Sequence, residues 1–207
     1  MALEVKNISF RYRNGPWILN NVSFRVDEGE RVALVGPSGY GKSTLSKIIA
    51  GYLQPTAGEI LWQGKPLPET GYCPVQLVYQ HPEKAINPRW KMADSLHEGW
   101  TPEQSMLDAM GIKPEWLGRW PNELSGGELQ RFCVVRALSP ETRLLIADEM
   151  STMLDVITQA QIWHLVIKVV EERKMGLIAI THNQPLAEKI ASRIIDLPAL
   201  NRLESIT

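Results

Sequence analysis

The chain has 207 residues, of which 44% are apolar and 22% charged, values close to those of ordinary globular chains. This length fits one domain, or one domain with a subdomain, and the composition excludes a disordered, collagen-like or coiled-coil protein. With 22 basic and 23 acidic side chains the net charge is −1, which argues against nucleic acid as the main partner.

The first part of the chain predicts strands. Residues 3–10 and 18–26 alternate apolar and polar side chains, as the half-buried strands of an antiparallel sheet do. The apolar run at 31–35 fits a strand that is buried on both faces, and a helix follows from about Lys42. Two further strands are expected at 59–63 and 75–79.

The middle of the chain is rich in tryptophan and in helix-start patterns, such as Thr101-Pro102-Glu103 and Lys113-Pro114-Glu115. We interpret it as a small helical subdomain, about 85–140, inserted in a single domain that spans residues 1–207. Its tryptophans either fill the core of the subdomain or form a docking surface for a partner. They are Trp90, Trp100, Trp116 and Trp120.

Helices and strands alternate in the rest of the chain. The expected order is a helix from about 126, a strand at 143–147, a helix at 156–173, a strand at 176–180, a helix near 184–191 and a strand at 193–197. This alternation implies a mainly parallel sheet with helices on both faces. The predicted fold class is therefore α/β, with a mainly parallel core sheet, an N-terminal antiparallel β-subdomain and the small helical subdomain.

Neither the cysteines nor the apolar runs indicate a secreted or membrane-spanning chain. Cys73 and Cys133 are far apart and lack the spacing of a disulfide framework or a zinc site, so two reduced thiols are expected. No run approaches the roughly 18 apolar residues that span a bilayer, and the first residues lack an apolar signal core. We therefore expect the chain to stay in the cytoplasm, with any membrane span supplied by another chain.

A glycine-rich segment between a predicted strand and a predicted helix matches the phosphate-loop pattern G-x-x-x-x-G-K-[ST]. Its glycines let backbone N–H groups turn toward a phosphate, and the helix N-terminus adds a positive dipole end. Lys42 can reach the β- and γ-phosphates, and Ser43 can ligate Mg²⁺. The predicted nucleotide-binding residues here are Gly36, Pro37, Ser38, Gly39, Gly41, Lys42, Ser43 and Thr44.

Two adjacent carboxylates, Asp148 and Glu149, end the apolar strand that begins near residue 143. Desolvating carboxylates is costly, so buried strands do not end in two acids without a reason. Beside a phosphate loop, Asp148 is predicted to hold Mg²⁺ and Glu149 to orient or activate the attacking water. The alternative is an exposed strand end with no chemical role.

The segment Ser125-Gly126-Gly127-Glu128 opens a predicted helix. Ser125 with Glu128 three positions later is a capping-box pattern, so a well-capped helix without further function is a serious alternative. Two glycines in a first turn, however, let a ligand approach the backbone N–H groups closely. One nucleotide does not need two triphosphate cradles in one chain, which suggests that two chains share it.

Taken in order, the motifs resemble the ATP-binding subunit of an ABC transporter, over almost the whole chain. They are GPSGYGKST, Gln80, LSGGELQR, LLIADE, MSTMLD and Thr181-His182. The resemblance implies the P-loop fold of ABC ATPases and hydrolysis of ATP, with Mg²⁺, in a head-to-tail dimer. It implies that Gln80 contacts Mg²⁺ and the attacking water, and that His182 contacts the γ-phosphate. It also implies that Tyr12 stacks on adenine, with Trp17 as the competing aromatic residue.

The resemblance assigns the remaining motif residues to a dimer interface. It implies that Ser125, Gly126 and Gly127 bind the γ-phosphate held by the opposite subunit, and that Asp155 crosses between subunits. His81, His97 and His164 have no comparable setting and are expected to be structural.

Finer matches narrow the resemblance to importers of dipeptides, oligopeptides and nickel. They are Gln80-His81-Pro82, Ile86-Asn87-Pro88-Arg89 and the segment 154–162. They imply an importer of peptides or of nickel and metal chelates. The implied partners are a second ATPase subunit, transmembrane permease subunits and, indirectly, a solute-binding protein, with no nucleic acid. The implied location is peripheral, on the cytoplasmic face of the cell membrane.

Three residues depart from the family pattern. Met150 stands where proline is usual, Met153 replaces a small residue, and Tyr40 sits where a small residue is commoner. We expect them to affect dimer closure or rate and to leave the charged groups intact. Two other functions remain open from the sequence: a soluble ABC-type ATPase that is not coupled to a permease, and a non-catalytic nucleotide-binding partner of an active subunit.

Overall fold

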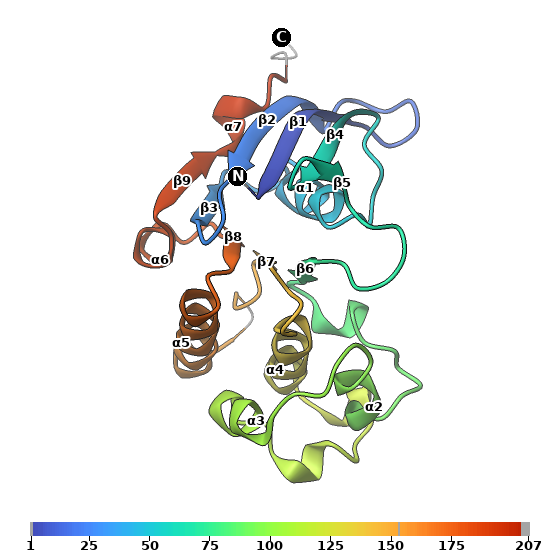
Figure 1. Cartoon of the computed structure of the whole chain (residues 1–207), viewed down its shortest axis with the longest axis vertical. Coiled ribbons are helices and arrows are strands. Elements are labelled where there is room, and N and C mark those ends of the chain that lie inside the picture. The colour runs from blue at the N-terminus through green and yellow to red at the C-terminus, as the bar shows by residue number, and fades with distance from the viewer. Residues whose placement is uncertain (1, 153, 204–207) are drawn as a thin grey trace.

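The computed structural model describes residues 2–152 and 154–203, and its strands form two sheets (Figure 1). The antiparallel sheet has the order β2-β1-β4-β5, and the parallel sheet has the order β6-β7-β8-β3-β9. The strands of the first sheet are β1 (Leu3–Phe10), β2 (Leu19–Val26), β4 (Ala57–Trp62) and β5 (Lys65–Pro66). Those of the second are β3 (Arg31–Val35), β6 (Val75–Val78), β7 (Leu144–Asp148), β8 (Gly176–Ile180) and β9 (Arg193–Asp196). The predicted α/β class with an antiparallel N-terminal sheet is confirmed.

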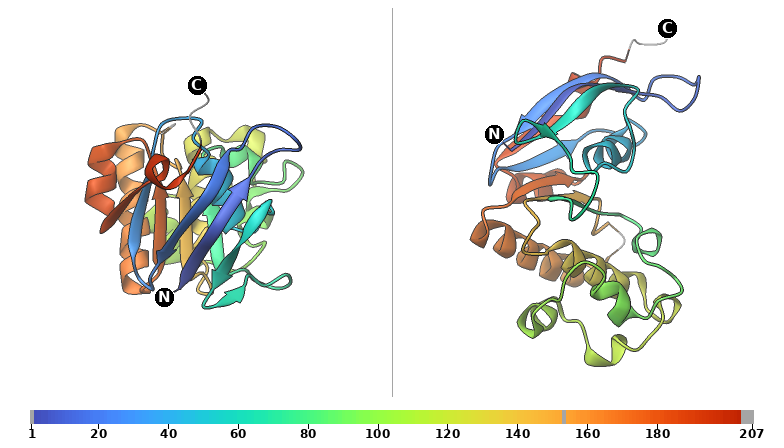
Figure 2. Two further views of the ribbon diagram at one scale, coloured as in Figure 1. Left: turned by 90° about the horizontal axis from the view of Figure 1, so that it is seen from above. Right: turned by 45° about the vertical axis from the view of Figure 1, so that its right-hand side comes forward.

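Helices cover the parallel sheet because its strands are apolar on both faces. All five residues of β7 and all five of β8 are buried. One apolar cluster joins the sheet to α1 (Lys42–Ile49) and the antiparallel sheet. The other joins its opposite face to α4 (Gly126–Ala137) and α5 (Val156–Glu172). Figure 2 shows this layering, with the antiparallel sheet and α1 on one side of the parallel sheet and α4 and α5 on the other.

The tryptophan-rich segment lies at the end of the molecule away from the antiparallel sheet (Figure 1). It contains α2 (Met92–Leu96), α3 (Gln104–Met110) and short 3₁₀ turns at Pro114–Trp116 and Pro121–Glu123, and a further 3₁₀ turn at Pro82–Lys84 precedes it. Its tryptophans divide between the two roles considered for them. Trp116 is buried and Trp100 packs against the core, whereas Trp90 and Trp120 are exposed by 38% and 42%.

The end of the described chain differs from the prediction. Helix α6 (Gln184–Ile190) and strand β9 are present as expected, but β9 continues into a short helix, α7 (Leu197–Leu200), that the sequence pattern did not predict. Leu197 is fully buried in the cluster shared by the two sheets. Among the helices of residues 2–152 and 154–203, none is both long and apolar enough to cross a membrane.

Candidate functional site

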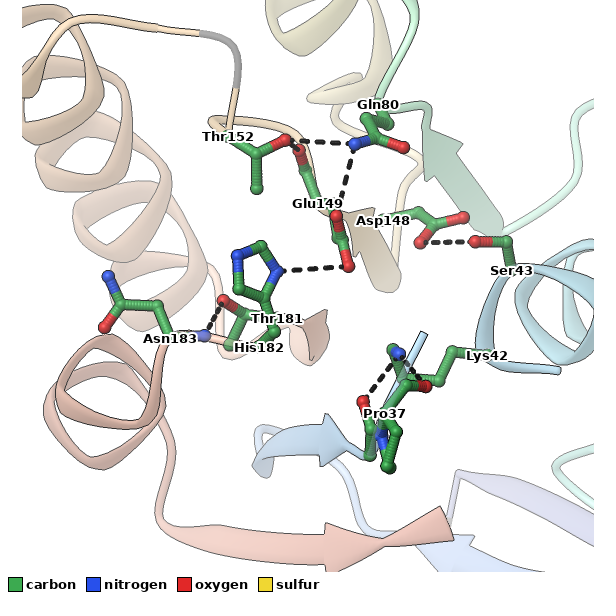
Figure 3. A network of polar contacts seen from close by, with 11 residues as sticks. Pro37, Lys42, Ser43, Gln80, Asp148, Glu149, Thr152, Thr181, His182 and Asn183 are labelled. Carbon is green, nitrogen blue, oxygen red and sulfur yellow. Dashed lines mark hydrogen bonds and ion pairs between the residues drawn. The ribbon is translucent and has the colours of Figure 1, made fainter. Parts of the chain in front are cut away.

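Four neighbouring parallel strands deliver the predicted residues to one edge of the sheet. The phosphate loop follows β3, Gln80 follows β6, Asp148 ends β7 with Glu149 directly after it, and His182 follows β8. Because these strands run in the same direction, their carboxyl ends meet at a single edge, where ligands of open α/β sheets bind. Figure 3 shows the side chains facing one another across this edge.

The phosphate loop is folded around its lysine. The Nζ atom of Lys42 donates to the carbonyl oxygens of Gly36 at 2.7 Å and Pro37 at 2.9 Å, and the residue is 6% exposed. Gly41, the N-cap of α1, has a φ of 87°, in the left-handed region that favours glycine. Ser38 and Gly39 are exposed. The loop thus presents its tip to solvent while its carbonyls hold the ammonium group at its base.

A hydroxyl and a carboxylate meet where a magnesium ion is expected. Ser43 Oγ donates to Asp148 Oδ1 at 3.2 Å, and Ser46 Oγ donates to Asp148 Oδ2 at 3.1 Å. Asp148 is 3% exposed, and burial raises the pKa of its carboxyl, an effect that the two serine hydrogen bonds oppose. Oxygen ligands of this kind are those that Mg²⁺ prefers. The donor set fits the ion, which Ser43 and Asp148 would hold, with the amide oxygen of Gln80 as the third predicted ligand.

The Asp148→Asn variant is expected to separate the cost of the buried carboxylate from its use. Without Mg²⁺ and nucleotide we expect its free energy of unfolding to rise by about 1 kcal/mol at neutral pH, because the neutral amide avoids part of the desolvation cost. Since the folded-state pKa of Asp148 is raised, the difference should vanish as the pH falls below the pKa of the unfolded chain.

Chemical denaturation with and without Mg·ATP measures both effects. Wild type should gain stability on adding Mg·ATP, whereas the variant should gain little beyond what ATP in EDTA provides. An equal Mg²⁺-dependent gain in the variant would contradict a metal role for Asp148.

The carboxylate of Glu149 lies between an amide and an imidazole. Its Oε2 accepts from Gln80 Nε2 at 3.2 Å, and its Oε1 lies 3.4 Å from His182 Nδ1 (Figure 3). Thr152, which the sequence did not single out, also accepts from Gln80 Nε2 at 3.2 Å and donates to the Glu149 carbonyl at 3.0 Å. All three predicted catalytic residues are therefore linked by contacts within one chain.

Glu149 has an unusual backbone conformation. Its φ is 46°, in the left-handed region, and its N–H donates to the carbonyl of Ile180 at 3.0 Å. This hydrogen bond extends the pairing of β7 with β8 by one residue beyond the strand. The left-handed turn then directs the side chain off the strand, toward Gln80 and His182. The conformation costs roughly 1 to 2 kcal/mol for a residue with a Cβ.

A polar cavity of about 160 Å³ is lined by Glu149, His182 and Trp163, among other residues. In its lining, Ser151 Oγ accepts from Gln159 Nε2 at 2.9 Å and from Trp163 Nε1 at 3.0 Å. Met150, which stands in the usual proline position, is 2% exposed and part of the core. Met153 lies outside the described residues, and Tyr40 is 41% exposed.

The Ser125 segment is a capped helix start with open space before it. Ser125 and Glu128 form the predicted capping box: Ser125 N donates to Glu128 Oε2 at 2.7 Å, and Glu128 N donates to Ser125 Oγ at 3.3 Å. The first of these hydrogen bonds is the largest cause that lowers the pKa of Glu128. A Cβ added to Gly126 would meet nothing within 4 Å. In the described part of the chain, no hydrogen bond joins the Ser125 side chain to the phosphate loop.

Asp155 has a structural role in the single chain. Its Oδ1 accepts from the N–H groups of Ile157 and Thr158, both at 3.0 Å, and so caps α5. These hydrogen bonds, that from Thr158 first, lower the pKa of the Asp155 carboxyl. A role across a subunit interface stays a prediction.

Both candidate adenine-stacking residues are exposed in the segment between β1 and β2. Tyr12 is 54% exposed and packs edge-on against Phe10, and Trp17 is 39% exposed with the Arg11 guanidinium 4.6 Å from its ring centroid. The choice between them stays open. His81, His97 and His164 make none of the contacts described above for the predicted site residues. Both Cys73 and Cys133 are free thiols.

The sequence is similar to the sequences of known proteins. A family model described as "ABC transporter" matches residues 19–152. The chain is 34% identical, over 220 residues, to the nickel import ATP-binding protein NikE of Escherichia coli K12, an alignment that covers 93% of this chain and 82% of the relative. The protein of the same name from Shigella dysenteriae serotype 1 gives the same identity and coverage.

Solved structures share the fold over nearly the full chain. The ATP-binding cassette MJ0796, described as a dimeric post-hydrolysis state bound to ADP and Pi, superposes with a TM-score of 0.80 at 25% identity. That match covers 94% of this chain and 93% of the other. A structure described as the ATP-binding subunit of an ABC transporter gives a TM-score of 0.77 at 27% identity, covering 95% and 87%.

Proposed function

This chain belongs to the ABC transporter family, as an ATP-hydrolysing subunit of the importer group, and from that premise we propose that it powers the uptake of nickel or nickel chelates, with short peptides as the second candidate. The observation that carries the cargo proposal is the 34% identity to NikE across 93% of the chain. The Gln80-His81-Pro82 and Ile86-Asn87-Pro88-Arg89 segments, typical of nickel and peptide importers, support it.

We propose that the working unit is a head-to-tail dimer with a second ATPase subunit. Each chain has a phosphate loop at the sheet edge and a glycine-rich helix start with open space before Gly126. Nothing in the described part of the chain joins the two through side-chain hydrogen bonds. A second subunit would place its own Ser125–Gly127 segment against the γ-phosphate bound by the first, so that each ATP lies between two chains.

We propose the following division of work at the sheet edge. The N–H groups of the loop and Lys42 bind the phosphates, and closure of the dimer excludes bulk water. Glu149 accepts a proton from the attacking water, which Gln80 and His182 hold in line, since both contact the Glu149 carboxylate. When bound between Ser43 and Asp148, Mg²⁺ supplies positive charge to the phosphate oxygens. Gln80 lies between β6 and the 3₁₀ turn at Pro82–Lys84, where the helical segment joins the sheet. A movement of the helical segment can therefore be transmitted to Gln80.

We propose that the helical end of the molecule docks on the permease. Trp90 and Trp120 are exposed there, and Lys91 Nζ lies 5.8 Å from the Trp120 ring centroid. Nearer to Gln80, a cleft of about 330 Å³ opens between α4 and the end of β6, lined by Tyr52, Tyr79 and others. Exposed aromatic side chains beside a cleft are favourable anchors for a partner helix.

Two tryptophan variants test this docking surface. Trp116→Ala should lower the free energy of unfolding by about 3 to 5 kcal/mol, because it empties a buried site. Trp120→Ala should lower it by less, about 1 to 2 kcal/mol, because the residue is 42% exposed and leaves only part of its apolar surface to lose. Only Trp120→Ala should reduce recovery of the permease with the folded chain. Unchanged recovery, with unchanged ATPase activity of the membrane complex, would contradict the docking surface.

The cargo is tested by uptake into cells that lack the gene. Cells complemented with wild type, with Glu149→Gln or with an empty vector are given radioactive nickel under limiting conditions and, separately, a labelled dipeptide. Loss of nickel uptake without the wild-type gene supports the first candidate, and loss of peptide uptake alone supports the second. Normal uptake of both would overturn the cargo proposal without touching the ATPase assignment.

A further inference from the structure

The short helix α7 lies against the phosphate loop, and the residue after it, Asn201, contacts the segment that packs against the other end of the loop. The side chain of Pro198 faces Gly36, the first glycine of the loop: a Cβ added to Gly36 would come within 2.8 Å of Pro198 Cδ and 3.8 Å of Leu197 Cβ. Leu197, fully buried, anchors the helix in the core. The first residue of the loop, Gly36, therefore packs against α7.

Asn201 connects α7 to the segment that supports the other end of the loop. It is 6% exposed, and its side chain accepts from Asn20 N at 2.8 Å and donates to the Ile18 carbonyl at 2.9 Å. Its own N–H donates to the Leu197 carbonyl at 2.8 Å. Both functions of the buried carboxamide are thus satisfied by the backbone on either side of Leu19.

The segment that Asn201 holds is packed against Gly41, the last glycine of the loop. A Cβ added to Gly41 would come within 2.9 Å of Leu19 Cδ2, 3.0 Å of Ile18 Cγ2 and 3.1 Å of the Ile18 carbonyl oxygen. Gly41 caps α1 and directly precedes Lys42. One turn of chain therefore supports the loop at both ends, Pro198 at Gly36 and Asn201, through Ile18 and Leu19, at Gly41.

We propose that Asn201 is a positioning residue for nucleotide binding, which keeps the phosphate loop in its binding shape before the nucleotide arrives. The proposal rests on the ATPase function and adds a residue that lies outside every motif of the family resemblance. A loop held in shape loses less conformational entropy on binding, so its affinity for phosphate is higher. Loosening the clasp formed by Leu197, Pro198 and Asn201 raises the dissociation constant without altering the groups at Glu149.

The test is titration of Mg·ADP, which reports on the phosphate loop of one chain, together with steady-state ATPase kinetics. Asn201→Ala should raise the Kd for Mg·ADP about tenfold and raise the KM for ATP similarly, with kcat within about twofold of wild type. Pro198→Ala keeps the Asn201 hydrogen bonds and removes the ring atoms nearest Gly36. It should raise the Kd in the same direction, and it remains informative if Asn201→Ala does not fold.

A stability-matched control separates positioning from general destabilisation. Thr142 is fully buried, donates to the Ala137 carbonyl at 2.8 Å and contacts Tyr72 Oη at 2.8 Å, just before the amino end of β7 and so at the opposite edge of the sheet. Thr142→Ala should lower the melting temperature comparably and leave the Kd within about twofold. Equal Kd values for wild type, Asn201→Ala and Pro198→Ala would overturn the proposal. An equal rise in the Kd of Thr142→Ala would overturn it as well. Absence of Mg·ADP binding by wild type would instead count against the ATPase function.

Discussion

Replacing Glu149 with glutamine is expected to slow ATP hydrolysis by a factor on the order of 10² to 10⁴ and to leave ATP binding intact. Glutamine has nearly the same shape, but its amide cannot accept the proton of the attacking water. The contacts with Gln80 and His182 hold the carboxylate at the sheet edge, where the proposed mechanism needs a proton acceptor. Phosphate release under saturating ATP, beside equilibrium binding of ATP, measures the two effects separately. Because ATP then persists, the variant should also accumulate as a dimer in size-exclusion chromatography with Mg·ATP.

The matched control is Glu141→Gln, which removes the same charge from an exposed turn before β7. It should hydrolyse ATP at the wild-type rate. If Glu149→Gln also turned over ATP at that rate, the general base would have to be another group, and the proposed division of work at the sheet edge would fail.

The Gly126→Gln variant is expected to have at least about 100-fold lower ATPase activity than wild type, without a loss of stability. Within one chain a Cβ at Gly126 meets nothing within 4 Å, and the change keeps the Ser125–Glu128 capping box. The new side chain should even favour the helix, since glycine is a poor helix former. In a head-to-tail dimer, however, it would occupy the space that the partner's γ-phosphate needs, and a displacement of about 1 Å is enough to cost 10²-fold in rate.

Gly118→Gln provides the comparison for this experiment, because a Cβ there also meets nothing within 4 Å. It should hydrolyse ATP normally in the absence of permease. Binding of Mg·ADP should be unchanged in both variants, since the phosphate loop is untouched. Full ATPase activity of Gly126→Gln would argue against a nucleotide site shared between two chains.

The strands and the long helices could be predicted from the sequence because their patterns are strong. The alternation at 3–10 and the apolar run ending at Asp148 both gave strands that lie within one residue of those observed. The two-residue strand β5 and the four-residue helix α7 were missed. Elements this short carry no periodicity, and tertiary contacts decide them: Leu197 is buried against both sheets, which no local pattern reveals.

The sequence predicted which residues form the candidate site better than it predicted the contacts between them. Motif spacing named Lys42, Asp148 and Glu149, and the fold places the strands that lead to them, β3 and β7, on either side of β8 in one sheet. Ser46 and Thr152 were not singled out, although each contacts a predicted residue. Ser46 lies one helical turn after Ser43, a spacing that would have placed both hydroxyls on the same face of α1. Thr152 had no such signal, because its contact depends on a loop conformation.

The backbone of Glu149 has a consequence for how this protein can be engineered. Glycine adopts a left-handed conformation at the lowest cost, so Glu149→Gly relieves strain at the residue to which we assign proton transfer. A library selected only for heat resistance would therefore be drawn toward losing the glutamate. Variants selected for thermal stability therefore have to be screened for ATP turnover as well, so that Glu149 is kept.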